Sequence, residues 1–393
     1  MPRNDALLKQ LLKQLGDLLI EYAIGVDRLT PRPRGGRLTG AACRQVEEVL
    51  TELEPLSRLK TSELVYGNGC FAVARYDDAA AVYQHVLEDG PDNPDARFNL
   101  ALACLRLRQP QEAVDHLTLL LEQGSGLPEI YYQRGNAYDD LRTRELAVGD
   151  YARAIELRPD YLQAIYNRGV VLARLDRHEE AVEAFDRAIA LRPELSNAYL
   201  NRGASQDELG KHQEAIADYT TAIECNPSNG DAYFNRARTH YYLGHIEDTI
   251  TDYSRVIEFL PDDAEAFNNR GLAFDAQEEY EKALSDYASA VALRPDFAES
   301  LSNRGAAFEA LGEIEEALSE YLAAVGSAPE FAAAHYNAAR LYAQSGDVES
   351  CLPHLEKAME LVPDLRAEAS DDDDLGWVLK LRGIKQERGR TPG

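Results

Sequence analysis

The sequence repeats with a period of 34 residues, and this period constrains the fold more than any other feature. The tripeptide Asn-Arg-Gly marks it at residues 167–169, 201–203, 269–271 and 303–305. Prolines recur with the same spacing, at Pro159, Pro193, Pro227, Pro261, Pro295, Pro329 and Pro363. Such a period predicts stacked pairs of antiparallel helices, each burying its apolar side on its neighbours.

Small and aromatic residues hold fixed positions within each period. Counted from Ser196, positions 8, 20, 24, 27 and 32 are Gly203, Ala215, Tyr219, Ala222 and Pro227. Over about residues 60–365 this pattern resembles the tetratricopeptide repeat (TPR) family. The resemblance implies an all-α fold: a right-handed TPR superhelix, or α-solenoid, of about nine helix-turn-helix repeats with N- and C-terminal capping helices. The nine repeats begin at Lys60, Pro94, Pro128, Leu162, Ser196, Gly230, Ala264, Ala298 and Ala332.

Three regions follow from this count: a helical region at 1–59, the repeats at 60–365, and a capping helix with a tail at 366–393. Residues 5–27 carry a leucine stripe typical of an amphipathic helix. This helix is expected to cover the end of the solenoid; dimerisation and membrane-surface binding are the alternatives. No strand is predicted anywhere in the chain.

The flanking regions carry further local signals. A basic, turn-rich linker is predicted at 28–37, and a second helix from Gly40 to Glu54, capped by Thr39 and stopped at Pro55. Near the other end, Asp371 to Asp374 precede a final helix that is expected to lay Trp377 over the last repeat. The tail after Arg388 is expected to be disordered.

The charge balance excludes some classes of partner. The net charge is -27, from 68 acidic and 41 basic residues, which disfavours nucleic acid and anionic membranes as partners. Five cysteines without a CxxC pair favour a reducing cytoplasm, with Cys70, Cys104 and Cys351 expected in the core rather than in a metal or redox site. No signal peptide or membrane helix is evident.

Chemistry-bearing motifs are not found. The P-loop, HExxH and GxSxG patterns do not occur, so neither catalysis nor a cofactor nor a metal is predicted. The eight histidines are scattered; His178 and His212 share a position in the turn between the helices of a repeat and are expected to be solvated. The resemblance likewise implies a non-enzymatic scaffold that binds a protein or peptide.

Asparagine recurs in the middle of the first helix of each repeat, helix A, although it is a poor helix former. The family resemblance implies that positions 2, 5, 6, 9, 12 and 13 of helix A line a concave groove. An asparagine ladder at position 6 is similar to the one with which the family's O-linked N-acetylglucosamine transferase holds peptide main chain. Inheritance by duplication and bonds between neighbouring helices are the alternatives. The predicted ladder is Asn99, Asn167, Asn201, Asn235, Asn269, Asn303 and Asn337.

Carboxylates occupy other groove positions, which predicts a basic ligand. The alternative is that these acidic residues only keep the protein soluble. The predicted charge-selecting residues are Asp207, Asp231, Glu265, Asp275 and Glu299. The carboxylate-clamp subtype of the family needs Lys or Arg at positions 2, 5 or 6; repeats three to nine lack them, so this subtype is rejected. The basic linker 28–37 is interpreted as a solvated loop, or as an autoinhibitory ligand of the groove. A homo-oligomer joined through the 5–27 helix and the solenoid ends is the alternative function.

Two further patterns are interpreted as structural. The aromatic residue of position 24 is expected in the core between repeats. Arginine at position 7 recurs with an acid at position 23, which predicts an ion pair between the two helices of a repeat.

Overall fold

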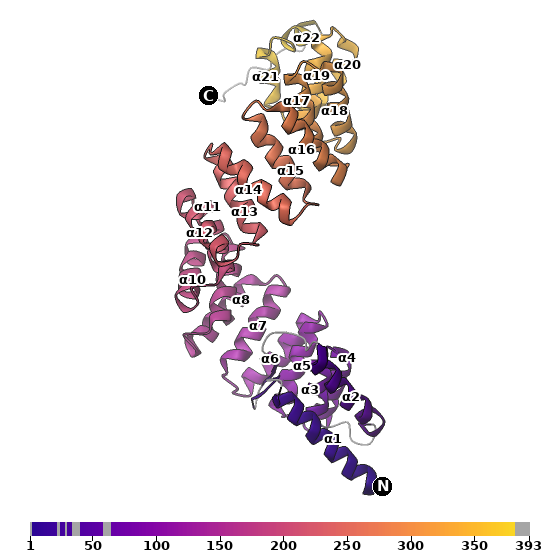
Figure 1. The fold of residues 1–393 in the computed structure, drawn as a ribbon, viewed down its shortest axis with the longest axis vertical. Coiled ribbons are helices and arrows are strands. Elements are labelled where there is room, and N and C mark those ends of the chain that lie inside the picture. The colour runs from indigo at the N-terminus through magenta and orange to yellow at the C-terminus, as the bar shows by residue number, and fades with distance from the viewer. Residues whose placement is uncertain (1, 22–23, 28–29, 34–39, 58–63, 382–393) are drawn as a thin grey trace, which may run out of the picture. The chain divides into compact units, whose positions relative to one another are not determined.

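The computed structural model describes residues 2–21, 24–27, 30–33, 40–57 and 64–381. These residues form 22 helices and one two-stranded hairpin, and the chain divides into two compact units, residues 1–194 and 195–393 (Figure 1). The elements of the first unit are α1 (Pro2–Glu21), β1 (Ile24–Asp27), β2 (Thr30–Pro33), α2 (Gly40–Ser57), α3 (Leu64–Ala72), α4 (Tyr76–Asp89), α5 (Pro94–Arg106), α6 (Pro110–Glu122), α7 (Pro128–Asp140), α8 (Arg144–Leu157), α9 (Leu162–Ala173) and α10 (His178–Leu191).

The second unit is helical throughout its described residues. Its elements are α11 (Ser196–Glu208), α12 (His212–Cys225), α13 (Gly230–Tyr242), α14 (Ile246–Phe259), α15 (Ala264–Asp275), α16 (Tyr280–Leu293), α17 (Ala298–Ala310), α18 (Ile314–Ser327), α19 (Ala332–Gln344), α20 (Val348–Leu361), α21 (Leu365–Asp371) and α22 (Gly376–Leu381). In both units each helix A packs against its own helix B and each helix B against the next helix A. The all-α solenoid fold is therefore confirmed.

The 34-residue register places the helices. Helix A of repeats two to nine begins at the residue that the period predicts, from Pro94 in α5 to Ala332 in α19. Helix B ends two residues before the recurring proline, as α8 does at Leu157 before Pro159. Proline disfavours a helical conformation in the residue before it, which explains this end point.

The core of a repeat is built around its position-24 aromatic ring. Tyr219 and Tyr287 are fully buried, as predicted for this position. A Cβ atom added to Gly203 would lie 2.8 Å from the ring of Tyr219 and 3.2 Å from the carbonyl oxygen of Ala215. Glycine at position 8 is therefore required mainly by the ring of its own repeat, more than by direct contact of the two helix backbones. Toward the next repeat, Tyr321 packs with Ala338 and Leu341.

The predicted ion pair between positions 7 and 23 is confirmed in five repeats. The guanidinium group lies 2.6–2.8 Å from the carboxylate in the pairs Arg134–Asp150, Arg202–Asp218, Arg236–Asp252, Arg270–Asp286 and Arg304–Glu320. Three of these arginines also donate to a hydroxyl at position 25 of the preceding repeat, in the pairs Arg134–Thr118, Arg236–Thr220 and Arg270–Ser254. The arginine thus joins two helices of its own repeat and a third from its neighbour.

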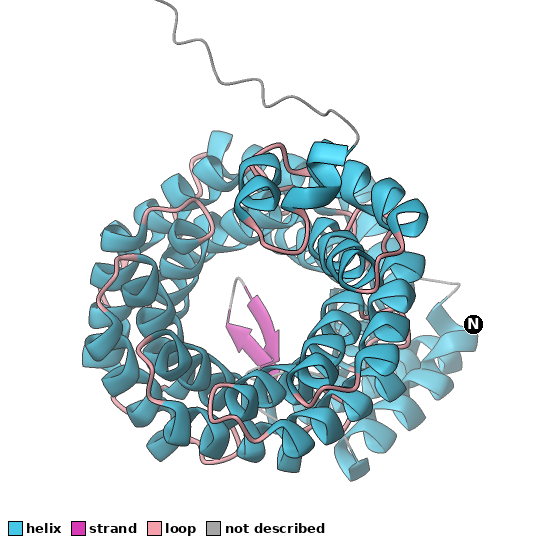
Figure 2. Cartoon of the chain, turned by 90° about the horizontal axis from the view of Figure 1, so that it is seen from above, coloured by secondary structure: helices cyan, strands magenta, loops and turns pink. Residues whose placement is uncertain are grey.

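The N-terminal region differs from its prediction in three ways. Helix α1 ends at Glu21 instead of extending to residue 27, because Ile24–Asp27 pairs as β1 with β2, Asp27 lying opposite Thr30 (Figure 2). The expectation of no strands was therefore wrong, and β2 occupies part of the predicted linker 28–37; residues 28–29 and 34–39 lie outside the described residues. Helix α2 runs through Pro55 to Ser57, past the predicted stop at Pro55.

The leucine stripe of α1 is covered by its own chain, as expected for a capping helix. Leu11, Leu15 and Leu19 are 3%, 0% and 1% exposed, in one cluster with Leu50 of α2. A Cβ atom at Gly69 of α3 would lie 2.9 Å from Leu15 and 3.0 Å from Leu50. Three helices therefore meet here, and α1 buries the face that a dimer would need.

The C-terminal cap also differs in detail from its prediction. Two short helices, α21 and α22, replace the single helix, and Asp372 between them accepts hydrogen bonds from the backbone N–H groups of Asp374 and Leu375. Leu375 and Val378 are fully buried against the last repeat, whereas Trp377 is 37% exposed. The expectation that Trp377 covers the repeat was wrong. The tail after Arg388 lies outside the described residues.

The turn between helices A and B has a left-handed residue in every repeat. Position 15 has a φ of +57° to +80°, and the residue is glycine in repeats five, six, eight and nine, at Gly210, Gly244, Gly312 and Gly346. In the other repeats it carries a side chain, at Ala74, Arg108, Arg142, Asp176 and Glu278. Glycine adopts this conformation without the steric cost that a Cβ atom brings.

Replacing Arg142 with glycine is therefore expected to stabilise repeat three by about 0.5–1 kcal/mol, because it removes the clash of a left-handed Cβ. Urea unfolding of the full chain measures this change. The matched control is Arg153→Gly in the interior of α8, which is expected to destabilise by about 1 kcal/mol. A loss of stability in the Arg142 variant would contradict the prediction.

Among the described residues, no helix is both long enough and apolar enough to cross a membrane.

Candidate functional site

The predicted site lies on one polar face of the A helices. Positions 2, 6, 9 and 12 are three or four residues apart, so they share a side of a helix. Several A helices contact the next A helix of their unit, as α11 does α13 and α15 does α17. The position-6 asparagines of such neighbours therefore follow one another along this face.

Three of the ladder amides bond to the preceding repeat. Each donates from Nδ2 to the Oδ1 of another asparagine at 3.0–3.1 Å, in the pairs Asn99–Asn68, Asn167–Asn136 and Asn303–Asn268. These bonds match the alternative interpretation, in which position 6 joins neighbouring helices. Part of the hydrogen-bonding capacity of these side chains is thus used inside the protein.

Asn99 does not fit the predicted role in ligand binding. Its side chain is 1% exposed, so a ligand cannot reach it in this structure. The strand β2 contacts α5, the helix that carries Asn99. We therefore remove Asn99 from the candidate site. The other six ladder residues, Asn167, Asn201, Asn235, Asn269, Asn303 and Asn337, are half-buried.

The position-12 carboxylates Asp207 and Asp275 of the second unit accept hydrogen bonds from side chains of the core. Asp207 accepts hydrogen bonds from the hydroxyl groups of Tyr219 at 2.9 Å and Thr239 at 2.5 Å, and lies 3.0 Å from Nδ1 of His212. Asp275 accepts from Tyr287 at 2.5 Å. Burial raises the pKa of Asp275, and burial together with Asp207 raises that of Tyr219. Both predicted charge-selecting residues are thus engaged inside the protein, and His212 is bonded rather than simply solvated.

In the first unit, side-chain amides accept the hydrogen bond from the position-24 tyrosine. The hydroxyl groups of Tyr83 and Tyr151 donate to the Oδ1 atoms of Asn68 and Asn136, at position 9 of the same repeats. These are the Oδ1 atoms that also accept from the ladder amides of the next repeat. In repeats one, three, five, seven and eight the tyrosine hydroxyl is thus satisfied by an amide at position 9 or by a carboxylate at position 12, whereas Tyr253 of repeat six has Arg238 and Tyr241 at these positions.

Sequence reasoning missed this use of positions 9 and 12, although the chain carries a signal for it. Repeat four has Phe185 at position 24, and its positions 9 and 12 are Val170 and Ala173. A ring without a hydroxyl needs no acceptor. The polar residue and the hydroxyl therefore disappear together.

Among the predicted charge-selecting residues, those that are exposed lie at position 2. Asp231, Glu265 and Glu299 stand in the first turns of α13, α15 and α17, and all three are exposed. Glu265 pairs with Arg294 at 3.2 Å, in a bridge that is itself exposed. These carboxylates are accessible to a ligand, unlike those of position 12.

Two histidines of repeat nine form a buried contact. His335, 7% exposed, bonds through Nε2 to the carbonyl oxygen of Pro329 at 3.1 Å, so Nε2 carries the proton. Its Nδ1 lies 3.0 Å from Nδ1 of His354, which must then be the donor. This contact leaves no room for an N–H group on both facing Nδ1 atoms.

Stability is expected to fall as the pH drops below about 6.5, the ordinary pKa of histidine. Burial lowers the pKa of His354 in the folded state, and His335 adds to this effect. Between the two pKa values the unfolded chain binds more protons, so acid favours unfolding, and the contribution is fully present above pH 6.5. Thermal unfolding from pH 7.5 to 5 should show this trend, and His354→Gln should reduce it. An equal slope in the variant would refute the assignment to this pair.

Comparison with known proteins supports the resemblance over most of the repeat array. Models of the tetratricopeptide repeat match residues 71–128, 132–196 and 302–364, residues 196–229 and 264–297, and residues 218–251. No curated protein matches the sequence.

Several solved structures are similar to this chain. The C-terminal part of a TPR repeat-containing protein from Cytophaga hutchinsonii has 16% identity and a TM-score of 0.53, over 61% of this chain and 99% of that one. YrrB, described as a TPR protein with an unusual peptide-binding site, has 26% identity and a TM-score of 0.40, over 48% and 98%. MamA from Desulfovibrio magneticus RS-1 has 21% identity and a TM-score of 0.41, over 47% and 96%.

Proposed function

Because the chain belongs to the tetratricopeptide repeat family, we propose that it is a non-catalytic scaffold that binds an extended, basic protein segment on the A helices of its second unit. The observation that carries the proposal is the pairing of positions 2 and 6. Asp231 and Asn235, one helical turn apart on α13, place an exposed carboxylate beside a half-buried amide. The pattern recurs with Glu265 and Asn269 on α15 and with Glu299 and Asn303 on α17.

The spacing of the A helices suits an extended ligand. Packed helices lie about 8–10 Å apart, and an extended chain advances about 3.3 Å per residue. One amide and one carboxylate would thus meet every third residue of the ligand. Each hydrogen bond contributes only about 0.5–1.5 kcal/mol, so binding needs several repeats at once.

The test uses a labelled 12-residue peptide with lysine at every third position and the full-length chain. The triple variant Asp231→Asn, Glu265→Gln, Glu299→Gln is expected to weaken binding at least tenfold at low salt. The matched control removes three exposed carboxylates from B helices, through Glu281→Gln, Glu315→Gln and Glu349→Gln. Equal loss in both variants would show that only net charge matters.

The amides need a separate variant, because some also bond internally. Asn235→Ala with Asn337→Ala avoids the ladder amides seen to donate across repeats, and it should weaken peptide binding while leaving the helix content unchanged. Unchanged affinity would remove the ladder from the proposal. Light scattering on the same samples tests the alternative of self-assembly. Burial of the leucine stripe of α1 argues against this alternative, because a dimer would need that stripe.

We separately propose an autoinhibitory role for the basic linker 28–37, as a ligand that competes for the A helices. The strand β2 carries Arg32 and contacts α5, a helix A of the first unit. Deleting residues 1–56 would also remove Leu15 and Leu50 from the core, so substitution is the cleaner test. Changing Arg28, Arg32, Arg34 and Arg37 to glutamine should raise affinity for the lysine peptide; unchanged affinity would exclude this role.

A further inference from the structure

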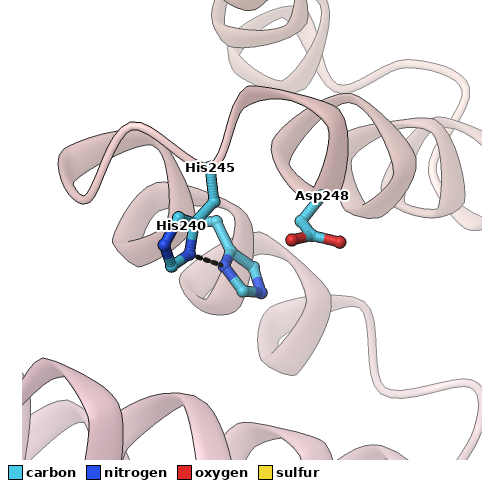
Figure 3. Close-up of side chains that lie close together, drawn as sticks. All are labelled: His240, His245 and Asp248. Carbon is cyan, nitrogen blue, oxygen red and sulfur yellow. Dashed lines mark hydrogen bonds between the residues drawn. The ribbon is translucent and has the colours of Figure 1, made fainter.

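A compact group of metal-ligating side chains stands at the helix A to helix B turn of repeat six. His240 lies in the last turn of α13, His245 caps α14, and Asp248 lies in the first turn of α14 (Figure 3). The Nδ1 atoms of the two histidines are 3.2 Å apart. One ligand atom from each of the three residues lies within 4.8 Å of the other two, and no other group of three among the described residues does so.

The repeat backbone itself brings these three positions together. They are positions 11, 16 and 19, and other repeats join positions 16 and 19 in ion pairs, as in Arg75–Asp78 and Arg177–Glu180, both at 2.6 Å. Positions 11 and 19 also meet elsewhere: Cys104 lies 3.9 Å from Glu112. The convergence is thus a property of the fold rather than of one rotamer. Repeat six alone has histidine at both positions 11 and 16.

The ligand set fits a borderline transition metal. Neighbouring ligands of a tetrahedral zinc with bonds of about 2.0–2.1 Å lie about 3.3 Å apart, close to the observed nitrogen separation. His245 and Asp248 are exposed, so their side chains can rotate to close the remaining gap. A surface pocket of about 330 Å³, lined by Gly244 to Asp248, leaves room for water as a fourth ligand.

A metal ion binds the bare lone pair of an imidazole nitrogen. Facing Nδ1 atoms need at least one bare lone pair, because two N–H groups at 3.2 Å would repel each other. The strongly negative net charge of the chain adds general attraction for cations.

We propose that His240, His245 and Asp248 bind a divalent transition-metal ion of the zinc class, which ties the two helices of repeat six together across their turn. Imidazole nitrogen with a carboxylate suits Zn²⁺, Ni²⁺ or Cu²⁺ far better than Mg²⁺ or Ca²⁺. The site stands apart from the position-2 and position-6 residues of the proposed peptide-binding face, and the two proposals can fail separately.

The experiment titrates the full-length, metal-free chain with ZnCl₂ by calorimetry, and with CoCl₂ while recording the visible spectrum. Wild type is expected to bind one ion and to show the intense bands of tetrahedral Co²⁺, with Mg²⁺ giving neither. His245→Gln and Asp248→Asn should each weaken Zn²⁺ at least tenfold, and both residues are exposed, so the variants should fold. The control is His178→Gln, which removes a turn histidine from repeat four and should leave binding unchanged.

A second readout is the thermal midpoint, since an ion that binds only the folded state raises it. Zn²⁺ should raise the midpoint of wild type and of the His178 variant, and leave the His245 variant unmoved. The proposal fails if wild type binds no Zn²⁺, or if the His245 and Asp248 variants bind it as wild type does. In that case the pair of positions 16 and 19 is only another surface contact of the kind seen at Arg177–Glu180.

Discussion

Replacing Asp252 with alanine is expected to lower the unfolding free energy of repeat six by about 3–5 kcal/mol. Asp252 is 3% exposed and accepts two hydrogen bonds of 2.8 Å from Arg236. The guanidinium group would remain where it is, because it also donates to Thr220 of the preceding repeat. Its charge, on a side chain that is 18% exposed, would then lose the carboxylate that it is bonded to, and that loss is the main cost.

The matched control lies on the same helix. Arg255 and Glu258 of α14 form an ion pair of 2.7 Å, but their side chains are 55% and 58% exposed. Glu258→Ala is expected to cost less than about 1 kcal/mol, because solvent already screens that pair. A cost for Asp252→Ala no greater than for Glu258→Ala would contradict the burial argument. The double replacement Arg236→Met, Asp252→Leu should cost much less than Asp252→Ala alone, since it leaves no unpaired charge.

The readout must follow the repeats separately. Each repeat of a solenoid contacts only its neighbours, so the repeats need not unfold together. A destabilised repeat six should therefore give the denaturation curve two transitions rather than shift a single one. Native-state hydrogen exchange in α13 and α14 would locate the loss. Uniform loss of protection over the second unit would instead mean that the unit unfolds as one.

Local repetition made the solenoid predictable. A proline, a glycine and an aromatic ring at fixed spacing each act within one helix pair, so the register of Pro227, Gly203 and Tyr219 was enough to place the helices. The position-7 to position-23 ion pair was predictable for a related reason. Repeat nine has Ala338 and His354 at these positions, so both charges are lost together.

The terminal regions were less predictable because they do not repeat. Ile24 and Val26 continue the apolar character of α1, yet they pair with β2. This segment is not repeated in the sequence, so no second copy was there to indicate a strand instead of a helix. At the other end, Trp377 is the most conspicuous apolar residue, but Leu375 and Val378 fill the core. The conformation of the preceding turn decides which side of a short helix faces inward. The 34-residue repeat pattern carries no information about that conformation.

The candidate site was predictable in its positions but not in the role of each residue. Asp207 and Asp231 are both acids on helix A positions, and composition cannot separate them. They differ in their partners within the repeat. Asp207 accepts a hydrogen bond from Tyr219 on the other helix, whereas Asp231 is exposed to solvent. Asn99 and Asn235 differ in the same way, one buried and one half-buried, and the helix that carries Asn99 also contacts β2.

Asp207→Ala is accordingly expected to destabilise repeats five and six by about 2–4 kcal/mol, rather than simply to weaken ligand binding. The substitution would leave the hydroxyl group of Tyr219, which is fully buried, without its acceptor, and would leave the hydroxyl group of Thr239 with only the carbonyl oxygen of Asn235 in its own helix. Because Thr239 belongs to the next repeat, the loss should also weaken the coupling between α11 and α13. Urea unfolding and hydrogen exchange of Thr239 and its neighbours measure the effect.

Two companion variants separate the acceptor from the charge. Asp207→Asn keeps one oxygen in place for both hydroxyl groups, and its amide can donate to Nδ1 of His212, so it should cost less than about 1 kcal/mol. Glu208→Ala removes the exposed neighbouring carboxylate and should be near neutral in stability. If Asp207→Asn were as destabilising as alanine, the negative charge itself, not the acceptor, would hold the repeat together. If Asp207→Asn instead left stability intact but abolished binding of the lysine peptide, Asp207 would return to the ligand face, and the division between core carboxylates at position 12 and exposed carboxylates at position 2 would be wrong.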